Sequence, residues 1–501
     1  MTDFRWRHAL SGRDGSSPLL VGAGRTWSVG EALAELGALR ERLAPSRVLG
    51  VLADNGPAWA MADLAAHDAG ITHLPLPGFF SPAQLRHAIE QTAADTLLTD
   101  RPECIGALDL QFAIVGSWQG LTWMRRVVPS AELPAGTTKI SFTSGSTGTP
   151  KGVCLSADGL RATAEAVYRR LDDLPLERHL AVLPLSLLLE NVAGLYAPLL
   201  RGMPSHLLPL ADLGWRGMAG FDPVALDAAV RASAASSVIL VPELLKAWTM
   251  LLQNAGRQAQ DGLRFAAVGG GRVDPDLLRQ ARERGIPAYQ GYGLTECGSV
   301  VTLNRPADDG GGADVGRPLA HASIRIEGGE VMVGTPAFLG YIGGASNTDA
   351  DFATGDLGKF DERGHLHLMG RRKNLLITSY GRNISPEWIE AALLAQAAFR
   401  QAIVVGDARP ALAALIVPSP GACEADIEAA LQAANQALPD YARVAHRLIV
   451  EPFTPENGLA TGNGRPVRAA ILHHHAAQVA ALYAQEQPRD VVLCATPGGP
   501  R

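Results

Sequence analysis

The sequence is poor in cysteine, in lysine and in long hydrophobic runs. Its five cysteines are scattered and odd in number, without the paired spacing of a metal site, so we expect reduced thiols in a cytoplasmic protein. It has no run of about 18 apolar residues, so we expect no membrane-spanning helix. The first ten residues are polar and do not suggest a signal peptide. The net charge is −6 at pH 7 and no basic stripe is present, so we expect no nucleic-acid partner.

Lysine occurs only at positions 139, 151, 246, 359 and 373, and the other cationic side chains are arginines. A lysine inside a motif is therefore stronger evidence for a functional role than it would be in a lysine-rich chain. The 501 residues are long enough for two or three domains.

Helical and apolar segments alternate over residues 25–100 and again after residue 156. The pattern predicts helices over residues 29–43 and 57–69, the first with Ser28 as N-cap and Glu31 completing a capping box. Another helix is expected from Ser156 to residue 171. Strands are expected at residues 48–52, 180–185, 237–241 and 265–268. This alternation predicts doubly wound α/β layers.

The pattern changes near residue 310. Residues 324–333 predict a hairpin with a Gly-Gly turn, which fits a small barrel-like subdomain. After residue 370 a smaller α+β pattern begins, with a helix that starts at Ser385 and Pro386 and another over residues 426–438. Strands are expected there at residues 401–405, 412–417 and 447–450. Three successive histidines, residues 473–475, fall in a helical segment without the i, i+4 spacing of a metal site.

The most informative segment is residues 140–152, which read ISFTSGSTGTPKG. Glycines let backbone N–H groups turn toward an anion, hydroxyls add donors, and Lys151 adds a mobile positive charge. The spacing is not that of a Walker loop. A flexible linker is the alternative interpretation.

This string resembles the phosphate loop of the acyl-adenylate-forming (AMP-binding) superfamily, and the chain as a whole is most similar to the long-chain acyl-CoA synthetases. The resemblance implies that the protein activates a carboxylic acid with ATP to give an acyl-AMP. It assigns a catalytic role to Lys151. It also implies nucleotide contacts for Thr143, Ser144, Gly145, Ser146, Thr147, Gly148 and Lys151.

A second block, YQGYGLTEC at residues 289–297, is similar to the Y-G-x-T-E motif of the superfamily. The resemblance implies nucleotide contacts for Tyr292, Gly293 and Thr295, and a catalytic and Mg²⁺-binding role for Glu296, because carboxylate oxygens suit Mg²⁺. Thr143 is expected to share the metal. Gly270 and Gly271 follow an apolar strand and are similar to the family's Gly-Gly-Ala segment, where glycine permits close approach to adenine.

Three further motifs extend the resemblance toward the C-terminus. Asp356, in a T-G-D-L-G string, is expected to accept hydrogen bonds from the ribose hydroxyls, and Arg371 to contact ribose or phosphate. Lys373 occupies the family's hinge position, about which the small domain would rotate between two half-reactions. Gly381, Arg382 and Asn383 would line a channel for the incoming thiol.

The acid is expected to meet residues 183–191, LPLSLLLEN, which resemble an L-P-L-S-H segment of the long-chain enzymes. An apolar lining suits an alkyl chain, because each buried CH₂ contributes roughly 0.8 kcal/mol. Leu187 replaces the family's histidine. A core strand and helix is an equally plain interpretation.

The motif that carries the family's late catalytic lysine has Arg465 in its place, and no lysine follows Lys373. Arginine keeps the positive charge but not the geometry. Three outcomes stay open: Arg465 substitutes for the lysine, which we favour; adenylation is slow while thioester formation is intact; or the protein binds nucleotide without efficient catalysis.

Taken together, the sequence predicts a large N-terminal domain, residues 1–369, of two doubly wound α/β subdomains and a small β-barrel. A hinge at 370–374, an α+β domain at 375–487 and a flexible tail at 488–501 would follow. The expected function is that of a medium- or long-chain fatty acid–CoA ligase that uses ATP, Mg²⁺ and CoA. The alternatives are an acyl-AMP ligase that loads a carrier-protein phosphopantetheine or another acceptor, or a nucleotide-binding pseudo-enzyme.

Overall fold

The computed structural model describes residues 5–143, 150–217, 220–308, 311–344, 347, 351–379, 382–462 and 464–484. The chain divides into two compact units, Met1–Lys373 with Thr461–Arg465, and Asn374–Ala460 with Pro466–Arg501. The first is a large α/β unit and the second a small α+β unit, which confirms the predicted fold class. Among the described residues, no helix has both the length and the apolar character to cross a membrane.

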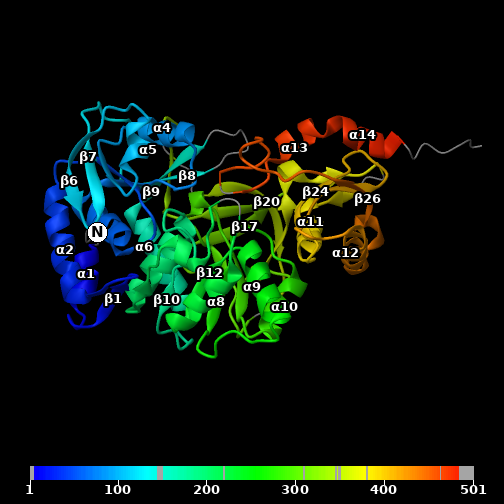
Figure 1. Cartoon of the computed structure of the whole chain (residues 1–501), viewed down its shortest axis with the longest axis horizontal. Coiled ribbons are helices and arrows are strands. Elements are labelled where there is room, and N and C mark those ends of the chain that lie inside the picture. Colours follow the sequence, from blue (N-terminus) through cyan, green and yellow to red (C-terminus); the bar gives the residue numbers. More distant parts are fainter. Residues whose placement is uncertain are drawn as a thin grey trace, which may run out of the picture. The chain divides into compact units, whose positions relative to one another are not determined.

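One sheet of the first unit has nine strands in the order β16-β15-β14-β13-β12-β10-β11-β1-β2. Its centre, from β14 to β1, is parallel, and the helices α9 and α10, green in Figure 1, connect its central strands. The strands are β1 (Pro18–Val21), β2 (Thr26–Ser28), β10 (His179–Leu180), β11 (Ser205–His206), β12 (Ser237–Leu240), β13 (Phe265–Val268), β14 (Ala288–Tyr292), β15 (Thr302–Leu303) and β16 (Arg317–Pro318).

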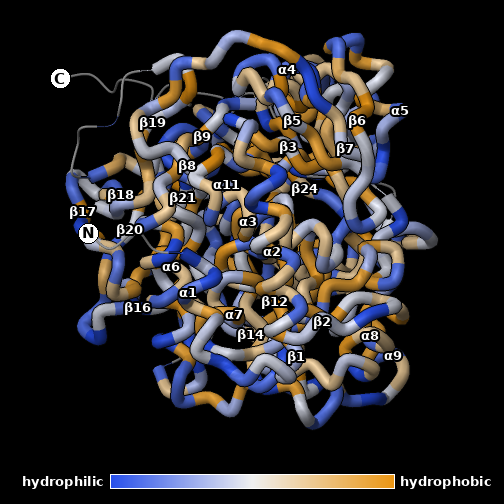
Figure 2. The backbone as a smooth tube through the Cα atoms, turned by 90° about the vertical axis from the view of Figure 1, so that its left-hand side faces the viewer, coloured by the Kyte–Doolittle hydropathy of each residue, from blue (hydrophilic) through white to orange (hydrophobic). Residues whose placement is uncertain are grey.

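A second sheet has eight strands in the order β19-β9-β8-β4-β3-β5-β7-β6. All five residues of β3 are buried, and the tube along β3 and β5 has mostly hydrophobic colouring in Figure 2, as expected for central parallel strands. The strands are β3 (Val48–Leu52), β4 (Thr72–Pro75), β5 (Thr96–Thr99), β6 (Ala113–Trp118), β7 (Leu121–Arg125), β8 (Thr137–Thr143), β9 (Lys151–Ser156) and β19 (Phe338–Tyr341).

The helices of the first unit confirm the expected local signals. Ser28 and Glu31 form a reciprocal capping box at the start of α2, and the Ser156 side chain caps α6. The helices are α1 (Trp6–Ser11), α2 (Val29–Leu43), α3 (Pro57–Ala69), α4 (Pro82–Gln91), α5 (Pro102–Gly106), α6 (Ala157–Arg170), α7 (Ala197–Arg201), α8 (Pro223–Ala232), α9 (Pro242–Asn254) and α10 (Pro275–Glu283). Shorter turns are η1 (Glu190–Tyr196), η2 (Leu210–Leu213), η3 (Thr295–Cys297) and η4 (Arg372–Asn374).

The expected strand at residues 180–185 is largely wrong, because β10 ends at Leu180. Side chains take the backbone donors that would continue the strand. The N–H of Leu183 donates to the Glu190 carboxylate (2.8 Å), and Pro184 has no N–H to donate. The chain then continues into the π-helix η1.

A small antiparallel sheet has the order β17-β18-β20-β21. Its first hairpin turns at Gly328 and Gly329, both with positive φ, as predicted. The order leaves β17 and β21 as edges among the described residues, so the predicted barrel is not confirmed. The strands are β17 (Ser323–Glu327), β18 (Glu330–Gly334), β20 (Phe352–Phe360) and β21 (Leu366–Arg371).

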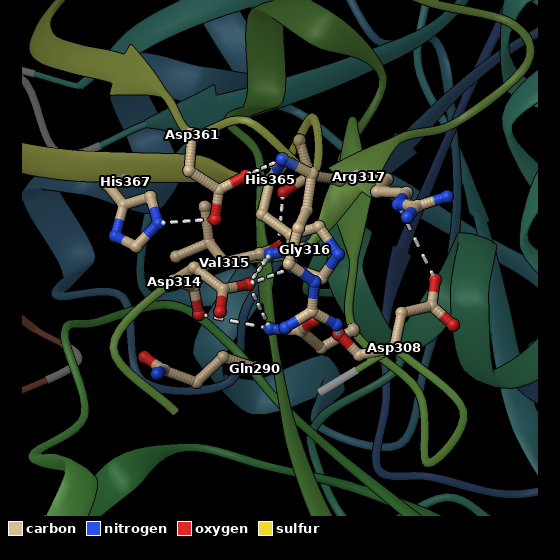
Figure 3. Close-up of polar contacts among 12 residues, drawn as sticks. Gln290, Asp308, Asp314, Val315, Gly316, Arg317, Asp361, His365 and His367 are labelled. Carbon is tan, nitrogen blue, oxygen red and sulfur yellow. Dashed lines mark hydrogen bonds and ion pairs between the residues drawn. The ribbon is translucent and has the colours of Figure 1, made fainter. Parts of the chain in front are cut away.

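A partly buried polar network fixes the turn between β20 and β21 (Figure 3). Oδ1 of Asp314 lies 2.9 Å from Nδ1 of the fully buried His365 and accepts the N–H of Gly316 at 2.9 Å. Asp361 accepts the N–H of His365 (2.9 Å) and lies 3.0 Å from Nε2 of His367. These contacts hold one end of the hairpin whose other end carries Asp356.

The second unit packs α11 and α12 with the three-stranded sheet β24-β25-β26. Ser385 caps α11 and Pro386 begins it, as predicted. His473 and His474 lie in the last turn of α13, and His475 is its C-cap, directly before α14. The elements are β22 (Leu376–Ile377), β23 (Asn383–Ile384), α11 (Pro386–Leu394), β24 (Phe399–Val405), β25 (Leu412–Pro418), α12 (Glu424–Ala437), η5 (Asp440–Ala442), β26 (Val444–Ile449), α13 (Arg468–His474) and α14 (Ala476–Ala484).

Candidate active site

Tyr292, Asp356 and Arg371 meet at the end of the β20–β21 hairpin. The Tyr292 hydroxyl donates to Oδ2 of Asp356 at 2.7 Å, and Nε of Arg371 lies 2.8 Å from Oδ1. Asp356 is buried, with 6% of its surface exposed. Burial, together with this carboxylate, raises the pKa of the Tyr292 hydroxyl, so the phenol stays a neutral donor. A buried carboxylate held in this way can accept hydrogen bonds from a diol.

Arg465 lies against the glycine segment that follows β13. Its Nη2 donates to the carbonyl oxygen of Gly270 at 2.6 Å, and Gly270 has φ +81°. The residue keeps exposed surface, but desolvation of its guanidinium lowers the pKa of Arg465; Glu243 opposes this shift and Arg371 adds to it. The glycine segment that is predicted to approach adenine therefore lies next to Arg465, the predicted catalytic arginine.

Glu296 lies beside Tyr341, which the sequence analysis did not single out. The Tyr341 hydroxyl donates to Oε1 of Glu296 at 2.9 Å. Nζ of Lys151 is 5.8 Å from the centroid of the Tyr341 ring. Lys151 begins β9 and pairs with Thr143 at the end of β8, so the residues that flank the predicted phosphate loop are paired, and one of them lies near the tyrosine that bonds this carboxylate.

Cys297 connects these groups. Its side chain belongs to the hydrophobic cluster against which Tyr292, the partner of Asp356, packs. Burial raises the pKa of the Cys297 thiol, and the charges of Glu296 and Asp356 add to the effect. Arg371 links Asp356 to the Arg465 group. The first unit thus brings together the predicted residues from four separate motifs.

Neighbouring atoms pack closely against the glycines of the site, most tightly at Gly293. A Cβ at Gly293 would lie 1.7 Å from the carbonyl oxygen of Ser299, and a Cβ at Gly270 would lie 3.3 Å from Arg465 Nη2. A Cβ at Gly271 would contact Pro242. Among the described residues no group of three or more His, Cys, Asp or Glu side chains could hold a metal. Mg²⁺ often binds through one or two carboxylates plus substrate phosphates, so Glu296 and the Thr143 hydroxyl fit that role.

Other predicted residues lie elsewhere or are not described. Thr295 begins η3 and precedes Glu296 directly. Ser144, Gly145, Ser146, Thr147, Gly148 and Gly381 lie outside the described residues. In the second unit, Asn383 lies in β23 and the Arg382 guanidinium lies 5.2 Å from the Tyr441 ring centroid. Lys373 is the last residue of the first unit's main segment.

Residues 183–191, the predicted acid-binding segment, lie partly beside the glycine segment and partly in the core. A Cβ at Gly269 would lie 3.3 Å from Leu189 Cδ2, so this leucine adjoins the glycine segment. Glu190 turns inward, where Oε1 lies 2.9 Å from Nε2 of the buried His179. The polar end of the motif is therefore part of the core, as the alternative interpretation expected, while Leu189 lies beside Gly269.

A buried charge cluster also escaped the sequence analysis. Nζ of Lys139 lies 2.8 Å from Oδ1 of Asp63, and His73 Nδ1 is 2.6 Å from the same oxygen. Asp63 Oδ2 accepts from Asn191 (2.7 Å) and from the Tyr196 hydroxyl (2.8 Å). The rarity of lysine was the one feature of the sequence that pointed to this cluster, because its residues lie on four separate elements.

Comparison with known proteins shows the family of the chain. A family model described as AMP-binding enzyme matches residues 15–343, and its C-terminal domain model matches residues 373–487. The chain is 28% identical to the long-chain-fatty-acid–CoA ligase FadD15 of Mycobacterium bovis, over 85% of this chain and 86% of that protein. It is 26% identical to the 2-succinylbenzoate–CoA ligase of Bacillus pumilus, over 77% and 81%. The structure of Bacillus subtilis O-succinylbenzoate coenzyme A synthetase with ATP and magnesium aligns with TM-score 0.74 and 22% identity, covering 93% and 98%.

Proposed function

Because the chain belongs to the AMP-binding enzyme family, we propose that it is an acid–thiol ligase that activates a carboxylic acid with ATP and transfers the acyl group to CoA. The observation that supports this most is the convergence of Lys151, Glu296, Asp356 and Arg465 in one unit.

The proposed chemistry has two balanced steps. A carboxylate oxygen attacks the α-phosphorus of ATP, the bond to the bridging oxygen breaks, and pyrophosphate leaves. The CoA thiol, as its thiolate, then attacks the acyl carbonyl and AMP leaves, while the thiol proton passes to water. Asp356 would hold the ribose, and Lys151 and Arg465 would stabilise charge on the phosphates. When bound at Glu296 and Thr143, Mg²⁺ would neutralise phosphate charge.

We propose a medium- or long-chain fatty acid as the substrate. Leu189 adjoins Gly269, and Leu187 replaces a polar position, so the wall next to the glycines is apolar. Burial of an alkyl chain there is favourable by roughly 0.8 kcal/mol per CH₂. An aryl acid is the second candidate, because relatives of comparable similarity are named 2-succinylbenzoate–CoA ligases.

The acceptor and the hinge are further parts of the proposal. Lys373 would serve as the hinge, since the main segment of the first unit ends at this residue and the second unit begins at the next one. Gly381, Arg382 and Asn383 would line the thiol channel. A carrier-protein phosphopantetheine presents the same thiol as CoA, so it is the alternative acceptor.

A pyrophosphate-release screen tests the function. Saturated acids of increasing chain length and a set of aryl acids are supplied with ATP and Mg²⁺, first without a thiol and with hydroxylamine as trap. We expect acid-dependent hydroxamate that is greatest for an alkyl acid, and a thioester when CoA is added. A signal with aryl acids only overturns the alkyl assignment. Thioester with a carrier protein but not with CoA overturns the acceptor. No acid-dependent signal overturns the ligase.

A further inference from the structure

We infer that Tyr341 is a positioning residue that orients the Glu296 carboxylate for a divalent cation and joins it to Lys151. The inference rests on the proposed function for the identity of the cation site. It adds a residue that none of the sequence motifs above contains, and it specifies a role that is separate from nucleotide binding itself.

The first observation is the contact between the two side chains. The Tyr341 hydroxyl donates to Oε1 of Glu296 at 2.9 Å. A hydrogen bond to one carboxylate oxygen restricts rotation of the whole carboxylate, so it fixes the direction of the other oxygen. Hydrogen-bonded partners of this kind orient metal-binding carboxylates, and their removal typically costs about 10- to 100-fold in metal affinity.

The second observation is that Tyr341 is itself rigidly held. It lies in β19, where it pairs with Val153 of β9. Its ring packs edge-on against Phe338, with centroids 5.1 Å apart, and Phe338 packs in turn against Phe352 at 5.3 Å. A tyrosine fixed by strand pairing and by aromatic packing can hold a partner more precisely than a side chain on a loop.

The third observation connects the carboxylate to the phosphate loop. Lys151 Nζ lies 5.8 Å from the centroid of the Tyr341 ring, within the range of a cation–π interaction. The hydroxyl of Tyr341 thus contacts the Glu296 carboxylate, while its ring lies near the Lys151 ammonium group.

The two contacts can be separated by substitution. Tyr341→Phe removes the hydroxyl and keeps the ring, so it should affect the cation site alone. Tyr341→Leu removes both, so it should also release Lys151. Tyr168→Phe, in α6 of the same unit, is the matched control, because its hydroxyl is near Arg169 instead of the site residues.

The readout is Mn²⁺ binding in the presence of ATP, followed by electron paramagnetic resonance without any acid substrate. We expect Tyr341→Phe to weaken Mn²⁺ binding by about 10- to 100-fold while metal-free ATP affinity is unchanged. Tyr341→Leu should weaken both, and Tyr168→Phe neither. In a Glu296→Gln background, Tyr341→Phe should cause no further loss. This cycle remains informative if the single variant is less stable.

The outcomes separate this inference from the function itself. Mn²⁺ affinity in Tyr341→Phe equal to that of the wild type overturns the positioning role. An undiminished Tyr341→Phe effect in the Glu296→Gln background also overturns it. Normal Mn²⁺ and ATP binding without pyrophosphate release on any acid overturns the ligase proposal and leaves the Tyr341 result standing. A wild-type chain that binds no Mn²⁺ with ATP overturns both.

Discussion

The Tyr292 hydroxyl and the Asp356 carboxylate, 64 residues apart, form a 2.7 Å hydrogen bond, and the other oxygen of Asp356 pairs with Arg371. The pair holds a buried carboxylate in one orientation. If this carboxylate receives the ribose, it should distinguish ATP from 2′-deoxy-ATP.

We therefore expect Asp356→Asn to lower ATP affinity by about 10- to 100-fold, since hydrogen bonds to charged groups contribute about 1.5–3 kcal/mol. The variant should lose most of the preference of the wild type for ATP over 2′-deoxy-ATP. Calorimetric titration with both nucleotides measures this. An Asp356→Asn variant that keeps the full preference would show that the ribose binds elsewhere.

Arg465 offers a test of the missing lysine. Arg465→Ala should slow acyl-AMP formation by about 100- to 1000-fold, the cost of losing one transition-state donor, while thioester formation from supplied acyl-AMP should change little. Arg465→Lys should raise the adenylation rate above that of the wild type. Single-turnover measurements of each half-reaction distinguish these effects. An unchanged rate in both variants would remove Arg465 from the catalytic group.

The buried cluster around Lys139 should dominate the stability of the first unit. Lys139→Met leaves the Asp63 carboxylate without its ammonium partner in a fully buried position, which typically costs about 3–5 kcal/mol. Lys359→Met, at an exposed position of β20, is the matched control and should change stability little. Urea unfolding measures both. Equal midpoints for the two variants would contradict the structural role of the cluster.

Asp361 predicts a pH dependence for the β20–β21 turn. The hydrogen bond from His367 and the N–H of His365 lower the pKa of Asp361 to about 2, below its usual value near 3.9. The folded state therefore prefers the ionised form, so this stabilisation is present above about pH 4 and is lost as the pH falls toward about 2.

We expect the difference in melting temperature between the wild type and Asp361→Asn to be constant from about pH 7 to about pH 5 and to shrink at lower pH. Thermal unfolding in matched buffers measures this. A difference that grows on acidification would mean that the pKa is raised instead of lowered.

Local signals allowed much of the fold to be predicted. The Ser28–Glu31 capping box and the Ser385–Pro386 helix start depend on neighbours in the chain, so they are visible in the sequence. The end of β10 could not be predicted in this way. The Leu183 N–H donates to the Glu190 side chain instead of to a neighbouring strand, and the hydrophobic periodicity of the sequence carries no sign of such a hydrogen bond.

The family resemblance indicated which residues would converge but not what holds them. Glu296, Asp356 and Arg371 belong to separate strings, yet the resemblance assigned them to one nucleotide. Tyr341 was missed because its relation to Glu296 follows from the pairing of β19 with β9, which brings together strands about 190 residues apart. Asp63 and Lys139 were missed for the same reason.

The central claim is that Asp356 and Glu296 contact one nucleotide at different ends. The most direct measurement is calorimetric titration of AMP and of Mg²⁺·ATP into the wild type, Asp356→Ala and Glu296→Gln. We expect Asp356→Ala to weaken binding of both nucleotides and Glu296→Gln to weaken only that of Mg²⁺·ATP. Unchanged affinity for both nucleotides in both variants would contradict it.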